Sequence, residues 1–450
     1  MNRRELLAGT AAAAGLALVP RLALAQGAPA GAPVQITFWH AMAGPLGEEL
    51  KRVCEAFNAA QKAAVVEPVF KGTYPETMTA AIAAFRAGKA PHLVQMYEVG
   101  TGSMLAAGAA VKQVWQLADE TGVRLDPAIY MPAVRSYYSL PDGRMASMPF
   151  NSSTPIMWCN KDLFERAGLD PERPPETWEQ VVTAAEALRS KGGAKVGMTT
   201  AWPTWVHLEC FGAIHDVPFA TKANGFEGLD AELVFNAPAM RGHITRLLEM
   251  AKAGTFTYAG RGAAGDSLFP AGETGISFNS SGLRAAVVRD ARFRPAAAQL
   301  PYDPAVRATP NNSIIGGASL WTMTAPDRTQ AEYKAVAAFL AFLAQPDTDA
   351  SWHQRTGYVP VTLGGAGLSL AQGYYARNPG ADIPIRQLNR GEVTVNSKGL
   401  RLGRLTEIRT IIEEEFETAL QGKQDAGAAL DAAVARGNKV LREFEKSVSR

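Results

Sequence analysis

An arginine lies on an otherwise apolar stripe of a predicted helix near the end of the chain. Leu405, Arg409, Ile412 and Phe416 follow one another at intervals of four, three and four residues, which places them on one helical face. A guanidinium on that face needs an anionic partner, because its desolvation is otherwise uncompensated. The partner is either a carboxylate of the chain itself or an oxyanion of a ligand, and the spacing favours neither.

Two hydroxyl-rich runs and a pair of tryptophans are further candidates for contact with a solute. The runs 151–154 (Asn-Ser-Ser-Thr) and 279–282 (Asn-Ser-Ser-Gly) can hydrogen-bond a phosphate or hydroxyl groups, although each is also typical of an ordinary turn. Trp202 and Trp205 bracket a Pro-Thr pair in a loop-like stretch. Exposed aromatic pairs often stack on ligands, whereas burial in the core is the more frequent fate of tryptophan.

Three predicted strands bring polar residues to one edge of a sheet. The β-prone runs 35–39, 65–70 and 92–97 alternate with two stretches whose apolar residues recur at helical spacing. Strands connected in this way run parallel, with right-handed crossovers, so all three end at the same edge. Open α/β sheets bind ligands at that edge. The topology therefore places Tyr74 and Glu98, which follow two of these strands, at a candidate binding site.

The remainder of the chain continues the alternation of short strands and helices. Strand-like runs lie next to polar turns at 156–159, 275–278 and around 313–323. Roughly the last hundred residues are mainly helical, with amphipathic stretches at 405–420 and 425–444. These patterns predict an α/β protein, and 450 residues give room for at least two domains. No flexible tether separates them, so we expect lobes connected by strands that cross between them.

The motifs of common enzyme classes are absent from the sequence. It contains no H-E-x-x-H zinc motif, no G-x-x-x-x-G-K-[ST] loop and no G-x-S-x-G nucleophile elbow. The six histidines are scattered without metal-ligand spacing. Cys54, Cys159 and Cys210 form no C-x-x-C pair, so no zinc or redox motif is indicated, and the sequence leaves room for one disulfide of unspecified pairing. We therefore expect no catalytic residues, no metal and no cofactor.

Residues 1–25 have the features of a cleaved signal peptide. Arg3 and Arg4 precede an alanine-rich apolar run at 6–20, and the small residues 23–25 match a cleavage site. The run is shorter than the roughly 20 residues of a membrane-spanning helix. We therefore expect an exported, periplasmic protein. The paired arginines are compatible with export by the twin-arginine route, and adjacent arginines also occur in ordinary signals.

The expected mature chain carries no net charge. The full chain has a formal charge of +2, and residues 1–25 contain three arginines and one glutamate, so the charge without them is 0. Binding to nucleic acid depends on a basic face, so we expect no nucleic-acid partner. No other run of the sequence is long and apolar enough to span a bilayer.

Six runs, in chain order, resemble the periplasmic glycerol-3-phosphate-binding proteins of ABC importers, a family of extracellular solute-binding proteins. Together they extend over essentially the whole mature chain. The N-K-D-L-F segment is shared by many sugar-binding relatives, whereas the other runs together are specific. The runs are 97–101 (Y-E-V-G-T), 149–155 (P-F-N-S-S-T-P), 160–178 (N-K-D-L-F-E-R-A-G-L-D-P-E-R-P-P-E-T-W), 314–321 (I-I-G-G-A-S-L-W), 352–360 (W-H-Q-R-T-G-Y-V-P) and 401–409 (R-L-G-R-L-T-E-I-R).

The resemblance implies a fold. It is the α/β, two-lobed periplasmic binding protein of the type II, maltose-binding-like class, with hinge strands and a central cleft. By similarity to that architecture, we expect residues 34–148 and 275–342 to form the N-terminal lobe. Residues 149–274 and 343–450 are then expected to form the C-terminal lobe.

The resemblance also implies which residues contact the ligand. We infer that Arg409 neutralises the phosphate of a small phosphorylated polyol, with Tyr358, Ser153 and the Gly317 N–H as further donors. Glu98 is then expected to accept hydrogen bonds from glycerol hydroxyls, because a carboxylate beside a phosphate would be repulsive. The glycine lets a ligand approach the backbone closely. The implied contacts are Tyr74, Glu98, Ser153, Ser280, Gly317, Tyr358 and Arg409.

The tryptophan pair bears on the choice of ligand. Trp202 and Trp205 match a pair in the family's second lobe, although Ala201 and Pro203 depart from its more glycine-rich setting. The indoles could stack on the glycerol, or on a choline-type substituent through cation–π attraction. The choice between sn-glycerol-3-phosphate and glycerophosphodiesters such as glycerophosphocholine therefore stays open.

These features predict the substrate-binding component of an ABC importer, and not an enzyme. We expect a monomer that closes on its ligand in the periplasm and contacts a permease in the inner membrane transiently. Two alternatives remain. An oligosaccharide-binding protein of the same fold would use several aromatic platforms and no inward arginine. An exported glycerophosphodiesterase would need a metal cluster or an activated nucleophile.

Overall fold

The computed structural model describes residues 31–448 of the chain. Within this range, the residues from Val34 onward form one compact unit. The predicted signal peptide, residues 1–25, lies outside the described residues. No helix within the described range has both the length and the apolar character that a membrane span requires.

A six-stranded sheet lies in one half of this unit. Its strand order is β2-β1-β3-β11-β4, and β5 also pairs with β11. β1 runs parallel to β2 and β3, which confirms the parallel arrangement predicted for the first three strands. β11 runs antiparallel to β3, β4 and β5. The strands are β1 (Val34–His40), β2 (Ala64–Phe70), β3 (Leu93–Tyr97), β4 (Val111–Lys112), β5 (Met148–Ser153) and β11 (Gly316–Met323).

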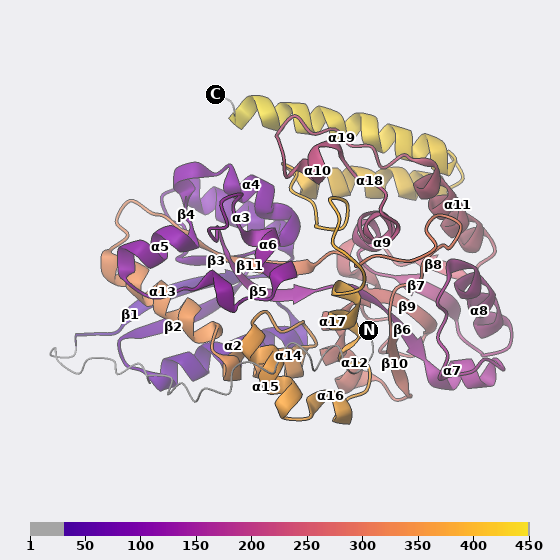
Figure 1. Ribbon diagram of the computed structural model, residues 1–450, viewed down its shortest axis with the longest axis horizontal. Coiled ribbons are helices and arrows are strands. Elements are labelled where there is room, and N and C mark those ends of the chain that lie inside the picture. The colour runs from indigo at the N-terminus through magenta and orange to yellow at the C-terminus, as the bar shows by residue number, and fades with distance from the viewer. Residues whose placement is uncertain (1–30, 449–450) are drawn as a thin grey trace. The chain divides into compact units, whose positions relative to one another are not determined.

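A five-stranded sheet lies in the other half (Figure 1). Its order is β10-β6-β9-β7-β8. β7 runs parallel to β8 and β9, whereas β6 runs antiparallel to β9 and β10. The strands are β6 (Pro155–Asn160), β7 (Val196–Thr200), β8 (Phe256–Tyr258), β9 (Thr274–Ser280) and β10 (Pro295–Ala298).

Helices cover both sheets. α2, α3, α6 and α13 pack on the first sheet, and α7, α8, α11 and α17 pack on the second. In chain order, the first nine are α2 (Gly44–Ala60), α3 (Tyr74–Arg86), α4 (Thr101–Leu105), α5 (Val114–Thr121), α6 (Pro132–Tyr138), α7 (Lys161–Arg166), α8 (Trp178–Ser190), α9 (Phe211–His215) and α10 (Thr221–Gly225). The others are α11 (Pro238–Lys252), α12 (Arg284–Asp290), α13 (Gln330–Leu343), α14 (Pro346–Thr356), α15 (Leu363–Ala371), α16 (Tyr374–Arg377), α17 (Ile383–Leu388), α18 (Leu405–Leu420) and α19 (Ala426–Val448).

Two neighbouring segments connect strands of the first sheet to strands of the second. One crossing passes through Thr154, between β5 and β6, and the other includes Ser313, just before β11. The hydroxyls of these two residues lie 2.5 Å apart, and the Gln387 amide donates to Ser313 Oγ at 2.9 Å and to Pro155 O at 2.7 Å. All of these groups are buried, so the two crossings are held together by a satisfied polar network.

The sheet pairing differs from the predicted lobe boundaries. Residues 275–342 were expected to belong with the first sheet, but β9 and β10 pair with β6 in the second. Similarly, β5 and α14 lie beyond the predicted limits of the first lobe, yet β5 pairs with β11 and α14 packs on α2. Hydrophobic periodicity identifies a strand, whereas its partner is set by contacts between residues that are distant in sequence.

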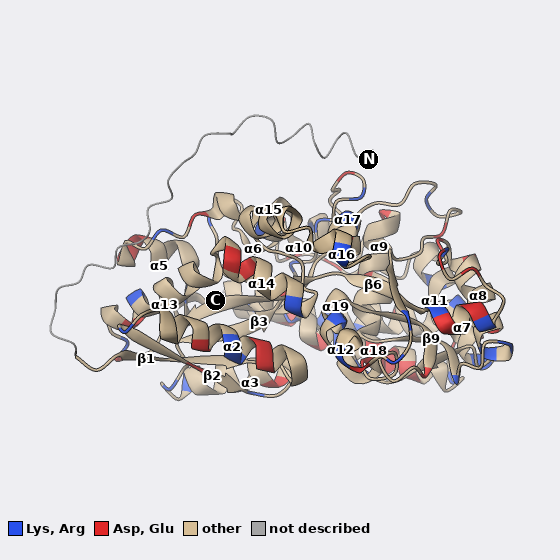
Figure 2. Ribbon diagram, turned by 90° about the horizontal axis from the view of Figure 1, so that it is seen from below, with Lys and Arg blue, Asp and Glu red and all other residues tan. Residues whose placement is uncertain are grey.

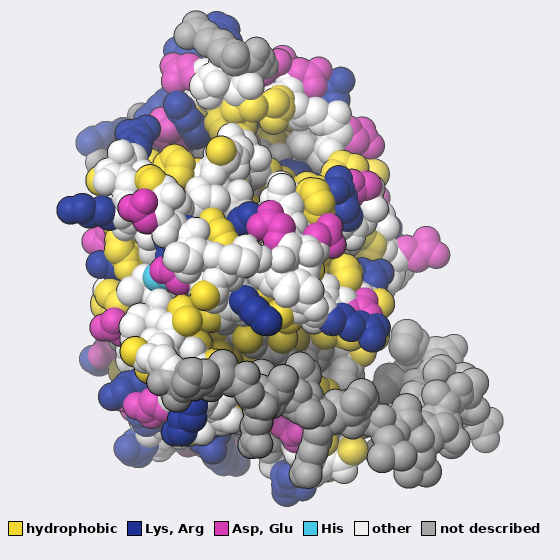
Figure 3. All heavy atoms as spheres, turned by 90° about the vertical axis from the view of Figure 1, so that its left-hand side faces the viewer, with side chains coloured by type: hydrophobic (Ala, Val, Ile, Leu, Met, Phe, Trp, Pro, Cys, Tyr) yellow, Lys and Arg dark blue, Asp and Glu magenta, His cyan; other side chains and the backbone are white. Residues whose placement is uncertain are grey.

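Charged side chains of both signs are spread over the surface. Figure 2 shows Lys and Arg among Asp and Glu on the helices of both halves. Figure 3 shows the side of the first sheet, where acidic, basic and apolar side chains are mixed, with no broad area of a single charge among the visible described atoms.

Close packing of α8 on β7 depends on a missing side chain. A Cβ at Gly197, in β7, would lie 2.1 Å from Ala185 O in α8. We therefore expect Gly197→Ala to push the helix from the sheet and to lower the free energy of unfolding by about 2 kcal/mol or more. Gly242→Ala is the matched control, because that glycine is exposed in α11 with nothing within 4 Å of its Cβ position. The free energy of unfolding of the control should rise by about 1 kcal/mol, because alanine favours a helix more than glycine does. Equal urea midpoints for the two variants would contradict this packing.

Candidate ligand-binding cleft

A cavity of about 590 Å³ lies where loops from both sheets meet. Its wall includes residues that follow β1, β2 and β3 in the first sheet and residues that follow β7 and β9 in the second. All nine residues proposed from the sequence line this one cavity, although they come from eight separate parts of the chain. They are Tyr74, Glu98, Ser153, Trp202, Trp205, Ser280, Gly317, Tyr358 and Arg409.

Strand ends position several of these side chains, as the topology predicts. Tyr74 is the first residue of α3, directly after the N-cap Thr73, whose side chain forms a capping box with Glu76. Glu98 opens a 3₁₀ turn immediately after β3. Ser153 and Ser280 are the last residues of β5 and β9. The end of a strand thus fixes the backbone while leaving the side chain free to face the cavity.

The inward arginine is bonded to carboxylates of the chain itself. Arg409, in α18, donates from Nε and Nη2 to the two carboxylate oxygens of Glu209, both at 2.7 Å. Nη2 also donates to Glu98 Oε1 at 2.7 Å. All three side chains are buried. The sequence left open whether Arg409 pairs with a carboxylate of the chain or with a ligand, and the structure shows the chain's own carboxylates. Arg409 and Glu98 nevertheless line the cavity.

Glu209 was missed in the sequence. It lies in the buried π-helical turn Trp205–Cys210, which also carries Trp205. π-Helical turns are rare and often occur at functional sites, but they have no reliable sequence signature. The prediction of a loop-like context for Trp205 was wrong for the same reason. The one available signal is an acidic residue within an otherwise apolar run, which needs a cationic partner when buried.

The cluster holds more negative than positive charge. Two carboxylates share one guanidinium, and a third, Glu413, lies in the same region and accepts a hydrogen bond from the Gly262 N–H at 3.4 Å. Burial raises the pKa of Glu98 to about 7, against the opposing effect of the Arg409 guanidinium. Glu98 therefore takes up a proton near neutral pH. The predicted role of Arg409 as a free counter-ion for phosphate does not fit this arrangement, because its Nε and Nη2 groups are already engaged.

Hydroxyl groups line the next part of the cavity. Asn151 Nδ2 donates to the Tyr74 hydroxyl at 2.9 Å, and Gln95 Nε2 donates to Asn151 Oδ1 at 2.9 Å. Burial raises the pKa of Tyr358 to about 12, and Asn151 and Tyr74, which lie close to its hydroxyl, oppose this shift. Ser153 is buried, and its hydroxyl has no hydrogen-bond partner among the described residues. These groups can all donate to an anion.

The two tryptophans play different parts in the wall. Trp202 is half-buried, has a φ of 53°, and its ring centroid lies 6.3 Å from that of Tyr74. Trp205 is buried at 4% exposure, and its Nε1 has no hydrogen-bond partner among the described residues. Its indole occupies the space that a side chain at Gly316 would need. Trp202 thus presents a ring face, whereas Trp205 presents an unpaired N–H donor.

Strand packing also requires a glycine at position 317, one of the predicted contacts. Gly317 has a φ of 85°, and a Cβ there would lie 1.8 Å from Asn151 O in the neighbouring strand β5. No other residue fits at this point of β11. The identity of Gly317 is therefore explained by strand packing, and close approach of a ligand is an additional consequence.

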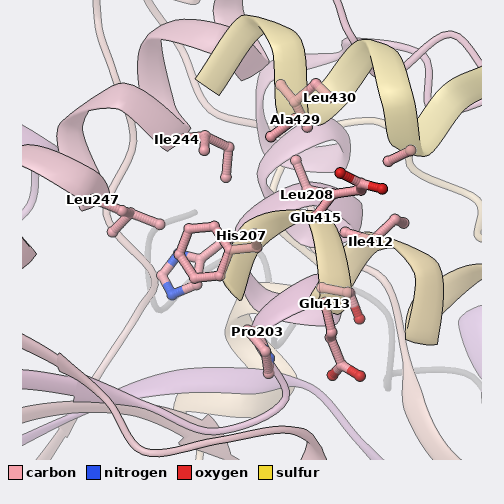
Figure 4. A pocket seen from close by; sticks show the side chains of 13 residues that line it. Pro203, His207, Leu208, Ile244, Leu247, Ile412, Glu413, Glu415, Ala429 and Leu430 are labelled. Carbon is pink, nitrogen blue, oxygen red and sulfur yellow. The ribbon is translucent and has the colours of Figure 1, made fainter. Parts of the chain in front are cut away.

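A second cavity, shown in Figure 4, is too small for a solute. It lies between the π-helical turn, α11, α18 and α19, and has a volume of about 20 Å³, roughly the room of one water molecule. Its wall is almost wholly apolar, with His207 on one side. The described residues contain no group of three or more His, Cys, Asp and Glu placed to hold a metal ion. Cys54, Cys159 and Cys210 are buried free thiols, so the disulfide that the sequence left open is not formed.

Residues 52–369 match the model of the bacterial extracellular solute-binding proteins, and the chain belongs to this family. The two sheets with crossing strands and a central cleft are the type II, maltose-binding-like fold predicted above. A solute-binding protein, and not an enzyme, is thus the class that fold and family define.

Particular relatives are closely similar along the whole chain. The sn-glycerol-3-phosphate-binding periplasmic protein UgpB of Salmonella typhimurium is 44% identical over 427 residues, which are 95% of this chain and 97% of that protein. UgpB of Pectobacterium atrosepticum is 44% identical over 421 residues, or 93% and 94% of the two chains.

Solved structures share the fold. UgpB of Mycobacterium tuberculosis in complex with glycerophosphocholine has a TM-score of 0.75 at 22% identity, covering 92% of this chain and all of that one. Maltose-bound MalE3 of T. maritima has a TM-score of 0.72 at 17% identity, covering 91% and 100%.

Removing the buried cation should be costly. Arg409→Ala leaves Glu98 and Glu209 buried without a counter-charge, so we expect a loss of about 3–5 kcal/mol in the free energy of unfolding, measured by urea denaturation. Arg436→Ala is the control, since that arginine pairs with Glu414 and Glu415 at the surface, with 42% of its side chain exposed. The control should lose less than about 1 kcal/mol. A similar small loss in both variants would show that the cluster is not desolvated.

The raised pKa of Glu98 predicts a pH dependence of stability. Between about pH 4.5 and pH 7 the unfolded chain has released this proton while the folded protein keeps it, so the contribution of Glu98 to stability falls as pH rises. The stability of the native protein relative to Glu98→Gln should therefore decrease over this interval. Taking the difference removes the opposite effect of buried histidines such as His207, whose pKa is lowered by burial. A difference that is constant from pH 5 to pH 7.5 would contradict the assignment.

Proposed function

We propose that this chain is the substrate-binding component of an ABC importer. It captures sn-glycerol-3-phosphate, and glycerophosphodiesters such as glycerophosphocholine, and delivers them to a permease in the inner membrane. The observation that supports this proposal is the convergence on one cavity of all nine candidate residues, the seven implied contacts and the two tryptophans. Close relatives that bind sn-glycerol-3-phosphate support the choice of ligand.

The geometry supports a division of roles that differs from the predicted one. A phosphate placed directly on Arg409 would bring a third anion beside Glu98 and Glu209, around a single cation. The glycerol hydroxyls fit this end better. They can donate to the carboxylate of Glu98 and accept from Nη1 of Arg409, which makes no hydrogen bond to a described residue.

The phosphate then belongs against the neutral donors. Ser153, Tyr74 and Tyr358 offer hydroxyls, and Trp205 offers a buried indole N–H without a partner. Ser280 and the Gly317 backbone complete the set implied by the resemblance. Hydrogen bonds to a charged oxygen are strong, and several neutral donors can hold an anion without a paired cation.

Capture would work by closure of two lobes on the ligand. The sheet pairing supports a division in which β1–β5 and β11 form one lobe and β6–β10 the other. The neighbouring crossings at Thr154 and Ser313 are suited to act as hinge strands. Because Glu98 and Ser153 come from the first lobe and Ser280 and Trp205 from the second, ligand contacts favour the closed form. The permease would recognise that form during a transient contact.

Location and assembly follow from the same proposal. The predicted signal peptide and the periplasmic relatives support export to the periplasm. Arg3 and Arg4 make the twin-arginine route one of the two candidate pathways. A single chain supplies every implied contact, so we propose that the protein acts as a monomer.

Calorimetric titration of the mature protein tests the function. We expect saturable binding of sn-glycerol-3-phosphate and glycerophosphocholine, no binding of maltotriose, and no release of choline on prolonged incubation. Ser153→Ala should weaken the binding of sn-glycerol-3-phosphate by about 10–100-fold, because one hydrogen bond to a charged group is lost.

Ser190→Ala is the control for this titration, because that hydroxyl lies on an exposed helix and donates to Glu186 O at 2.7 Å. Its affinity should equal that of the native protein. Binding of the oligosaccharide alone would establish the first alternative, and choline release would establish the second.

A further inference from the structure

One buried carboxylate acts on the cavity without lining it. The Glu209 side chain is 1% exposed and does not line the cavity, whereas its partner Arg409 does. Both Glu209 oxygens accept hydrogen bonds from Arg409, from Nε and Nη2, at 2.7 Å. A bidentate pair of this kind fixes the orientation of a guanidinium. Glu209 therefore determines which N–H groups Arg409 presents to the cavity.

Glu98 and Glu209 share this guanidinium unequally. Arg409 Nη2 donates to Glu98 Oε1 at 2.7 Å, and the same Nη2 also donates to Glu209. The carboxylate that holds two charge-assisted hydrogen bonds is the better stabilised anion. Two carboxylates at one buried site repel each other, so a proton is retained on the one with fewer such bonds, which is Glu98.

The electrostatics of the cluster agree with this asymmetry. Burial raises the pKa of Glu98 to about 7, and the charge of Glu209 adds to the rise, whereas Arg409 opposes it. A ligand hydroxyl that donates to Glu98 favours the ionised carboxylate, because a hydrogen bond to the charged form stabilises that form. Below neutral pH, a ligand bound in this way displaces the proton of Glu98.

The other titratable groups that face Glu98 keep their charge state near neutral pH. Against the effect of burial, Glu209 and Glu98 raise the pKa of Arg409 well above its ordinary value. Glu413 lies on the far side of this cation, from the next turn of α18, and burial raises its pKa. Burial also raises the pKa of four tyrosines and one cysteine around Glu98, so these groups are neutral: Tyr74, Tyr97, Tyr137, Tyr138 and Cys210.

Two further kinds of group bear on any exchange of protons. Burial lowers the pKa of all six histidines of the chain, so they are largely neutral above their ordinary pKa. Asp266 lines the cavity, and burial raises its pKa to about 6. Asp266 is therefore the group that an experiment must separate from Glu98.

We propose that Glu209 is a positioning residue that couples ligand capture to the release of a proton. It holds Arg409 in place and, by sharing that cation, leaves Glu98 protonated until a ligand hydroxyl donates to its carboxylate. The O–H bond of the Glu98 carboxyl group then breaks, and the proton passes to the solvent. Capture is therefore strongest above neutral pH. This inference rests on the proposed function of the same cleft and adds how the site responds to pH.

Calorimetric titration of the native protein counts the proton. The probe is glycerophosphocholine, because its phosphodiester does not titrate near neutral pH, whereas a phosphate monoester does at about pH 6. At about pH 6.5, titrations in Pipes and bis-Tris, which differ in ionisation enthalpy, should show the release of about half a proton or more per ligand. The affinity should fall about tenfold from about pH 8 to about pH 5.5. Uptake of a proton, or no exchange, would overturn the inference.

Glu209→Gln tests the residue itself. The amide oxygen can still accept from Arg409, but the competing charge is lost, so Glu98 should ionise at lower pH. At about pH 6.5 the release should fall to about a quarter of a proton or less, and the loss of affinity in acid should move down by about one pH unit. A merely structural role would weaken binding equally at every pH. An unchanged pH dependence in this variant contradicts the proposal.

Glu209→Asp is the second variant, and it decides the matter if Glu209→Gln does not fold. It keeps the charge on a shorter side chain, so binding should weaken while the proton release persists. Loss of the release in this variant would contradict the proposed role of the charge. Glu415→Gln is the matched control, since Glu415 lies on the same helix and pairs with Arg436 away from this cavity. Its pH dependence should equal that of the native protein.

Substitution of the two candidate acids identifies the source of the proton. Glu98→Gln should abolish the release, whereas Asp266→Asn should leave it unchanged. Release that persists in Glu98→Gln belongs to another group and overturns the inference.

The possible results separate the two claims. If the native protein binds glycerophosphocholine at no pH, the proposed function is wrong. If it binds with constant affinity from about pH 5.5 to about pH 8, the proposed function stands and only the inference about Glu209 is wrong.

Discussion

Three buried hydrogen bonds connect one arginine to two glutamates from different parts of the fold. Glu98 follows a strand of the first sheet, Glu209 lies in a π-helical turn beside the second sheet, and Arg409 comes from a helix near the end of the chain. The net stabilisation from such a cluster is small, because the desolvation of three charges offsets their attraction. Its geometry is nevertheless strongly constrained, since any displaced member would leave an uncompensated buried charge.

This constraint determines what the cleft can recognise. The only arginine among the implied contacts is already neutralised, so a phosphate is better held by hydroxyl and N–H donors than by a free cation. The pair of Glu98 and Arg409 is suited to the hydroxyls of the glycerol, which can both donate to Glu98 and accept from Arg409. Specificity then depends on the placement of several neutral donors. The N–H of Trp205 and the hydroxyl of Ser153 have no hydrogen-bond partner among the described residues, and a bound ligand would supply one.

Part of this site could be predicted from the sequence by physical reasoning. The helical stripe indicated that Arg409 faces inward, and the order of strands and helices placed Tyr74 and Glu98 at one sheet edge. Ser153, Ser280, Gly317 and Tyr358 required the resemblance to a known family, because a serine in a turn or a glycine in a strand has ordinary explanations. For Gly317, strand packing against Asn151 is one of them.

Local sequence patterns could not predict other features of the structure. Glu209 belongs to a π-helical turn, which leaves no periodic signal in the sequence. The strand β9 was recognisable as a strand, but it pairs with β6, more than a hundred residues earlier in the chain. The predicted lobe boundaries therefore do not follow the sheets, since sheet membership is decided by long-range pairing.

A crystal structure of the mature protein with sn-glycerol-3-phosphate tests the central claim most directly. The account predicts a phosphate surrounded by Ser153, Tyr74, Tyr358 and Trp205, with the glycerol hydroxyls on Glu98 and Arg409 and the bonds between Arg409 and Glu209 intact. A phosphate bonded directly to Arg409, with Glu98 or Glu209 displaced, would contradict it.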